Sequence, residues 1–453
     1  MGTSSSAGAR RDTSLDVLRT LAALGVVATH ARWLAHPSAP RTGSLWEDIH
    51  TSLWVGSRTS VYLFFALSGF LIARPFITAL LGGAPLPEWR DYARRRVARI
   101  VPAYWLAFTA FLVFGFATSA TFVNVADHYL LLHNEVPGDT GNLLPVAWTL
   151  GIEASFYVAV PLVALVARRR WTSAVSETRL LAWLGGLTVA SGALHLAVFT
   201  RALPTGWRTV EQYTLPAQFL FFAPGVVLAV VEHRRRRPVL QPRTIAVAGA
   251  CAAAGWVYCM YLFAVPGTRA GISSIGFALL SGLILCLGRW SPEPVSPVGR
   301  AMVWVGTVSY GLYLWHWLVM RAFYGWWGAA FAGTGALSWP LSTALVFALS
   351  LPLAAASFSF VERPAMRLAA GRRRRAPARD EGTAQPRGTA AEPRGTAAEP
   401  GGLSATTRGM AAQLGGTAAQ RGPGTAVARP PRRPVPTLPP PTTLSSPRGS
   451  VPW

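Results

Sequence analysis

The chain has 453 residues, of which 51% are hydrophobic and only 13% are charged. Its mean hydropathy of +0.33 excludes an ordinary soluble globular protein and favours a membrane protein. All 42 basic residues are Arg and the net charge is +23, but they form short clusters between apolar runs, which is a topology signal rather than a nucleic-acid-binding face. We therefore expect a protein of the lipid bilayer with no nucleic-acid partner.

Ten hydrophobic segments follow one another along the chain. Each is long enough, at 1.5 Å rise per residue, to approach or cross a hydrocarbon core of roughly 30 Å. The sequence therefore predicts an all-α fold, a polytopic membrane bundle of about ten transmembrane helices. The expected spans are residues 15–35, 60–81, 100–118, 145–167, 180–200, 214–231, 244–265, 271–288, 300–323 and 339–361.

The two ends of the chain differ in composition from this membrane domain, residues 15–375. Residues 1–14 form a short N-terminal segment of small and polar residues. Residues 376–453 are rich in Pro, Gly, Ala and Arg and contain the imperfect repeat PRGTAAEPRGTAAEP, a composition typical of a disordered tail.

The Arg residues predict the orientation of the bundle. Alternate connections carry clusters, such as Arg94 to Arg96, Arg168 to Arg170 and Arg234 to Arg237, whereas the connections between them are nearly free of Arg. By the positive-inside rule the Arg-rich connections and both termini are cytoplasmic. One alternative is that Leu21 to Ala28 forms the apolar core of a cleaved signal peptide.

The three cysteines, Cys251, Cys259 and Cys286, lie inside apolar runs. Their spacing fits neither a CxxC pair nor a zinc site. We therefore expect no disulfide framework and no metal ion.

Ionisable side chains inside a membrane are costly, so each one is a candidate functional residue. In the first span Arg19 and His30 are 11 residues apart, which puts them on one helix face roughly 16 Å from each other. Glu153 is the acidic residue well inside a span, with Tyr157 one turn further along. Either an interfacial Arg or a buried His can also serve packing alone.

A second polar stripe lies in the segment VSYGLYLWHW. Ser309, Tyr313 and His316 follow there at positions i, i+4 and i+7 of one helix. In the second span, Ser68 and Gly69 would allow a close approach of helices, which is also the simplest packing interpretation of small residues.

The orientation allows an estimate of depth for each polar residue. His30, His316, Glu153 and Ser68 all come out roughly 20 Å from the cytoplasmic side, and Arg19 within roughly 10 Å of it. The bundle is therefore expected to have a basic inner mouth that leads to a polar centre. Another intramembrane residue, His195, reaches that depth without polar neighbours, and we interpret it as structural.

Six segments, in this order, resemble the acyltransferase-3 family of integral membrane O-acyltransferases over about residues 12–370. They are LDVLRTLAALGVVATH, FFALSGFLI, RRRVARIVPAYW, WTLGIEASFY, SYGLYLWH and FVERP. The chain departs from the family pattern at Val17, where Gly is usual, and at Thr149, where Ser is common. Neither change removes a group that could act in catalysis.

The resemblance implies transfer of an acyl group, often acetyl, from cytoplasmic acyl-CoA to a hydroxyl of a carbohydrate, lipid-linked glycan or glycosylated metabolite. It implies a bacterial plasma membrane protein that uses acyl-CoA as co-substrate and has no tightly bound cofactor. The family's Arg-x10-His motif falls on Arg19 and His30, and its RxxR motif on Arg96 and Arg99. We expect a stand-alone form, without the esterase-like domain that some members append.

Acyl transfer from a thioester needs a base near the acceptor hydroxyl, and a desolvated neutral imidazole suits this task. We therefore expect His30 as base, with Glu153 or His316 to orient it. Three arginines, Arg19, Arg96 and Arg99, would bind the CoA phosphates, although the Arg cluster could equally be a topological anchor. Acceptor contacts are expected from Ser68, Tyr157 and Tyr313.

A transporter or flippase is the alternative from another class, because it would also bury Arg, His and Glu in a ten-helix bundle. The major transporter folds show internal symmetry. The two halves of this sequence show no such correspondence, which favours the enzyme.

Overall fold

The computed structural model describes residues 12–35, 58–114, 116, 120–135, 143–171, 175–203, 213–235, 237–263, 267–331 and 339–371. The chain divides into two compact units, Met1–Arg379 and Asp380–Trp453, and all described residues lie in the first. Within the described ranges every regular element is a helix. The all-α fold class predicted from the sequence is confirmed.

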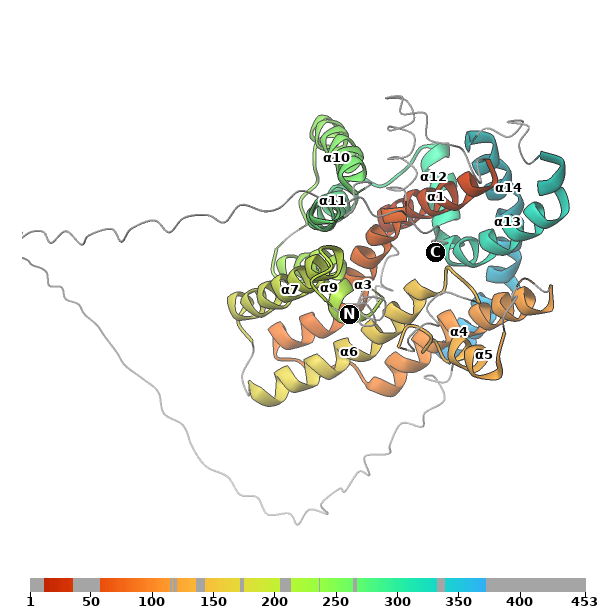
Figure 1. The fold of residues 1–453 in the computed structure, drawn as a ribbon. Helices are drawn as coiled ribbons and strands as arrows, with labels where there is room; N and C mark the ends of the chain where they lie inside the picture. Colours follow the sequence, from red (N-terminus) through yellow and green to blue (C-terminus); the bar gives the residue numbers. More distant parts are fainter. Residues whose placement is uncertain are drawn as a thin grey trace, which may run out of the picture. The chain divides into compact units, whose positions relative to one another are not determined.

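The elements are shown in chain order in Figure 1. They are α1 (Thr13–Ala35), the 3-10 turn η1 (Arg58–Ser60), α3 (Val61–Gly82), α4 (Trp89–Val113), α5 (Phe122–Tyr129), α6 (Trp148–Arg170), α7 (Glu177–Phe199), α9 (Leu215–Val231), α10 (Pro242–Phe263), α11 (Thr268–Trp290), α12 (Pro297–Thr307), α13 (Ser309–Phe331), α14 (Trp339–Ser357), the π-helical turn η2 (Phe358–Glu362) and α15 (Arg363–Gly371).

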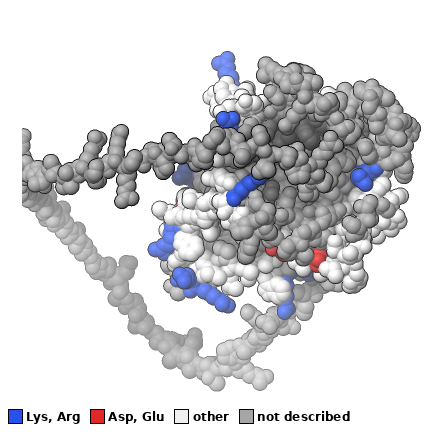
Figure 2. Space-filling model, in the orientation of Figure 1, with Lys and Arg blue, Asp and Glu red and all other residues white. Residues whose placement is uncertain are grey.

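Each predicted span overlaps at least one helix, and seven of the described helices are long and apolar enough to cross a membrane. These seven are α3, α4, α6, α7, α10, α11 and the continuous run Trp339–Gly371. The chain is therefore a multi-pass membrane protein. The total of ten spans and the cytoplasmic position of both termini stay predictions. Figure 2 shows a described surface that is mostly uncharged, with separate Arg side chains, as lipid-facing helices require.

The predicted start of the third span, residue 100, was wrong. Helix α4 begins at Trp89, so the Arg cluster lies on the helix and not in the connection before it. Arg is a good helix former, and Arg94 pairs with Asp91 one turn earlier at 2.7 Å. The cluster therefore lies on the first turns of a helix and not in a loop.

The predicted span 300–323 was also wrong, because it contains the end of one helix and the start of another. Helix α12 begins at Pro297, where the Ser296 side chain accepts a hydrogen bond from the backbone of Gly299. It ends at Thr307, and α13 starts at Ser309. Ser capping and Pro at the first helical position are typical of a helix start.

Helix α3 is the central helix of the bundle and contacts α1, α6, α9 and α11. Its closest approach is to α9, and the two run side by side in Figure 1. A Cβ atom added at Gly225 would lie 1.9 Å from the Ala66 carbonyl oxygen, and one at Gly69 would lie 2.2 Å from that of Phe222. Only glycine permits this contact between backbones, so Gly69 has the packing role expected for it.

The α3–α9 contact yields a stability prediction. Gly225→Ala should destabilise the detergent-solubilised protein by about 1–3 kcal/mol, because the new methyl group overpacks a contact between backbones. The measurement is thermal or denaturant unfolding. Gly249→Ala on α10 is the matched control, since nothing lies within 4 Å of its added Cβ. Equal stabilities of the two variants would show that the helices separate at little cost.

Candidate active site

A cavity of about 110 Å³ lies between α1, α3, α4, α6 and α13. We call it the central cavity. Seven of the nine site residues predicted from the sequence line its wall, namely Arg19, Ser68, Arg96, Arg99, Glu153, Tyr157 and Tyr313. The structure therefore brings together most of the site residues that the sequence predicted on five separate helices.

Within this cavity Ser68 Oγ donates a hydrogen bond to Glu153 Oε1. The two residues lie on α3 and α6, and both are half-buried. A carboxylate in a low-dielectric setting needs a hydrogen-bond donor. The sequence predicted Glu153 or His316 as the group that orients His30, whereas Glu153 accepts a hydrogen bond from the Ser68 hydroxyl.

Tyr313 joins α13 to the first turn of α6. Its phenol donates a hydrogen bond to the Val146 carbonyl at 2.6 Å, and its oxygen lies 2.6 Å from Thr149 Oγ1. Both contacts are buried. The Tyr313 ring is therefore held in one position on the cavity wall.

The two remaining predicted residues, His30 and His316, contact each other. His30 Nδ1 lies 2.8 Å from His316 Nε2, and His316 Nδ1 lies 3.2 Å from the Leu312 carbonyl oxygen. A carbonyl only accepts hydrogen bonds, so His316 donates from Nδ1 and its Nε2 accepts from His30 when both rings are neutral. This chain of hydrogen bonds places the lone pair of His30 on Nε2.

The histidine pair adjoins the central cavity but does not line it. The His316 ring lies 5.8 Å from the ring of Tyr313, which does line it. The His30 and Trp317 rings pack nearly perpendicular to each other, with 5.0 Å between their centroids. The depth estimate fixed heights within the bilayer but not lateral positions, which is why it could not separate the two histidines from Glu153.

The three arginines enter the cavity from α1 and α4. Arg19 forms an ion pair with the buried Asp16 at 2.5 Å, and Arg96 lies over the rings of Tyr92 and Tyr157 at 5.5 and 5.6 Å. By contrast, Arg95 is half exposed and lines neither cavity described here. The sequence did not single out Asp16, although its place three residues before Arg19 on a helix was a usable signal.

A second cavity, of about 350 Å³, lies beside the first, and we call it the inner cavity. The two share three wall residues, Arg19, Leu71 and Arg99. Asp12 and Asp16 at the start of α1 also line the inner cavity. The two arginines therefore stand where the cavities meet.

Three other histidines lie away from both cavities. His195 is buried between the rings of Phe199 and Phe221, as its structural interpretation requires. His128 and His133, on α5 and the turn after it, stack at 4.3 Å between ring centroids. Burial, and then the neighbouring His128, lowers the pKa of His133 to about 3, and burial also lowers the pKa of His128.

In the part of the chain that the structure describes, no group of three or more His, Cys, Asp or Glu side chains is placed to hold a metal ion. The sequence matches the acyltransferase-3 model, described as an acyltransferase domain, over residues 12–358. The chain belongs to the acyltransferase-3 family. It is therefore an enzyme that transfers acyl groups, and the transporter alternative falls away.

Several curated relatives resemble this acyltransferase. "Nodulation protein 10" of Rhizobium leguminosarum bv. viciae is 26% identical over 81% of this chain and 97% of that protein. "Acyltransferase MdmB" of Streptomyces mycarofaciens is 25% identical over 82% of this chain and 95% of its own. "Peptidoglycan O-acetyltransferase OatA" of Listeria monocytogenes is 24% identical, and this chain spans 49% of its length. No solved structure matches the chain.

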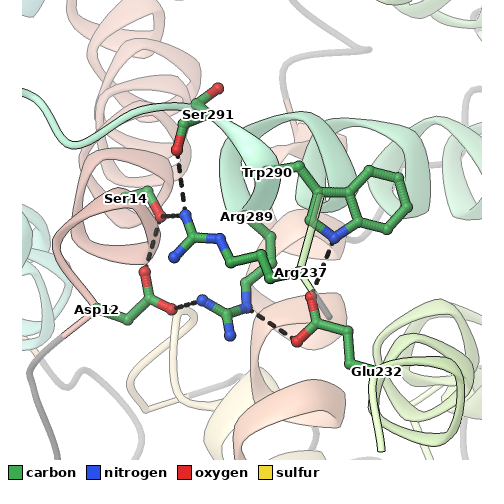
Figure 3. Close-up of polar contacts among 7 residues, drawn as sticks. All are labelled: Asp12, Ser14, Glu232, Arg237, Arg289, Trp290 and Ser291. Atoms are coloured by element: carbon green, nitrogen blue, oxygen red, sulfur yellow. Dashed lines mark hydrogen bonds and ion pairs between the residues drawn. The ribbon is translucent and has the colours of Figure 1, made fainter. Parts of the chain in front are cut away.

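The acyltransferase-3 match begins at Asp12, which belongs to an ion-pair network that the sequence did not predict (Figure 3). The buried Arg289 of α11 pairs with Asp12 and, at 3.1 Å, with Glu232 at the end of α9. Trp290 Nε1 donates to the same Glu232 at 3.0 Å, and Arg237 donates to the Ser291 carbonyl at 3.1 Å. The network ties the start of α1, the helix of Arg19 and His30, to α9 and α11.

Arg289→Met should destabilise the protein by about 2–3 kcal/mol, because it leaves the nearly buried Glu232 and the partly exposed Asp12 without their shared counter-charge. Unfolding in detergent measures the loss. Arg243→Met, at an exposed position on α10, is the control and should lie within about 0.5 kcal/mol of wild type. Wild-type stability of Arg289→Met would mean that water reaches and solvates the two carboxylates.

Proposed function

We propose that this acyltransferase moves an acyl group from acyl-CoA to a hydroxyl of a carbohydrate or glycosylated acceptor, with His30 as general base. The observation that carries the proposal is the hydrogen-bond chain from Leu312 through His316 to His30. A neutral imidazole with its lone pair on Nε2 can take the acceptor's proton. It stands next to a cavity that three arginines line.

The donor assignment rests on the charge and geometry of the cavities. Guanidinium groups bind phosphate oxygens through paired, charge-assisted hydrogen bonds. Arg19, Arg96 and Arg99 line the central cavity, and two of them also face the inner cavity. The CoA phosphates would bind there, with the thioester directed toward Ser68 and Tyr313. No tightly bound cofactor is needed for this chemistry.

The acceptor class rests on the relatives. One is a "Peptidoglycan O-acetyltransferase" and another, from Rhizobium meliloti, an "Exopolysaccharide production protein". Both names refer to polymers built from sugars, which supports a carbohydrate hydroxyl as acceptor. Mass spectrometry of surface glycans and secreted metabolites, from cells with and without the gene, tests this assignment, and an unchanged acylation pattern would contradict it.

The catalytic prediction concerns His30. His30→Ala should insert in membranes and bind acyl-CoA as wild type does, yet lose acyl transfer on the order of 100-fold or more, the usual contribution of a general base. His316→Ala should lose less, because it only orients His30. The control is His195→Phe, which keeps the ring volume in an aromatic pocket. Near-normal acyl transfer by His30→Ala would show that His30 is not the base and would leave His316 as the candidate.

The donor prediction concerns Arg99. Arg99→Ala should weaken acyl-CoA binding by about 1.5–3 kcal/mol, the range for a hydrogen bond to a charged group, and Arg99→Lys should restore only part of it. Equilibrium binding of acetyl-CoA to the purified protein measures both. Arg95→Ala is the control from the same cluster. Unchanged affinity together with disturbed membrane insertion would make Arg99 a topological anchor.

A further inference from the structure

The proposed function leaves the Ser68–Glu153 contact in the central cavity without a task. A hydroxyl that donates to a carboxylate is the arrangement of an activated nucleophile and its base. We propose that Ser68 takes the acyl group from acyl-CoA as a serine ester, with Glu153 as base, before His30 activates the acceptor. The inference rests on the proposed donor and acceptor, and it divides the reaction into two steps.

The hydrogen bond of Ser68 differs from that of an ordinary packing hydroxyl. Ser and Thr inside helices commonly donate to the carbonyl four residues earlier, as Thr29, Ser155 and Ser350 do in this structure. Ser68 donates instead to Glu153 on another helix. The next residue, Gly69, packs on the Phe222 carbonyl of α9, so this turn of α3 is fixed by its glycine contact while Ser68 is directed at α6.

The positions of the two cavities and the histidine pair support a relay. A donor whose phosphates bind Arg19 and Arg99 meets Ser68 in the same cavity. His30 lies beside that cavity and not in its wall, since its partner His316 lies 5.8 Å between ring centroids from Tyr313, which lines it. An acceptor bound next to the histidine pair would therefore approach the Ser68 ester from the side opposite to the donor phosphates.

Each step balances in atoms and protons. In the first, Glu153 takes the Ser68 proton as Oγ attacks the thioester carbonyl, the C–S bond breaks, and the proton passes to the CoA thiolate. In the second, His30 Nε2 takes the proton of the acceptor hydroxyl, whose oxygen attacks the serine ester. The C–Oγ bond breaks, and the proton returns to Ser68 Oγ. The products are CoA and the acylated acceptor.

The test uses the purified full chain and acetyl-CoA labelled in the acetyl group, with no acceptor added. Label should become bound to wild type and to His30→Ala, in which the second step is blocked and the ester persists. It should be absent from Ser68→Ala, and Glu153→Gln should load on the order of 100-fold more slowly. Ser350→Ala, a buried serine outside both cavities, should load as wild type does.

The His30→Ala protein keeps the test valid even where Ser68→Ala folds poorly, because mass spectrometry can locate the label with Ser68 intact. Label on the peptide that contains Ser68, stable at neutral pH and released by alkaline hydroxylamine, is the expected result. Label on a histidine, absence of label from His30→Ala, or normal acyl transfer by Ser68→Ala would each overturn the relay. Failure of wild type to consume acetyl-CoA with any glycan acceptor would instead refute the proposed function.

Discussion

An unpaired polar group in hydrocarbon costs several kcal/mol, and this cost organises the structure. Several described polar side chains of the bundle meet partners from another helix. Ser68 pairs with Glu153, His30 with His316, and Arg289 with Asp12 and Glu232. Each pair satisfies its own members and holds two helices together, so the groups that suit chemistry also determine which helices are neighbours.

Helix α1 is the element on which both halves of the candidate site depend. Its first turns carry Asp16 and Arg19 at the inner cavity, and its far half carries His30 against α13. The Arg289 network fixes its start, and the Trp339 indole donates to the Ala28 carbonyl at 2.7 Å near its other end. A helix held at both ends keeps Arg19, the proposed donor-binding residue, and His30, the proposed base, at a constant separation.

The apolar runs predicted the helical elements well, because the bilayer demands long uninterrupted apolar helices. They predicted boundaries poorly where charge or capping intervened. Arg94 to Arg99 were expected in a connection, but Arg tolerates a helix end and snorkels to the interface. The break at Val308 went unnoticed because the segments 301–306 and 310–315 around it are mostly apolar and aromatic, and the Ser296 and Pro297 start signal lies well before it.

The sequence by itself determined the fold class, the family and the residues that carry charge or hydroxyls within the spans. The depth estimate also predicted that His30, His316, Glu153 and Ser68 share one layer. The tertiary structure decided the partners: it joined Glu153 to Ser68, His316 to His30, and Arg289 to two carboxylates. The reason is geometric, because hydropathy and helical rise fix a residue's height and its face on one helix, whereas contacts such as Gly69 on Phe222 and Gly225 on Ala66 fix which faces meet.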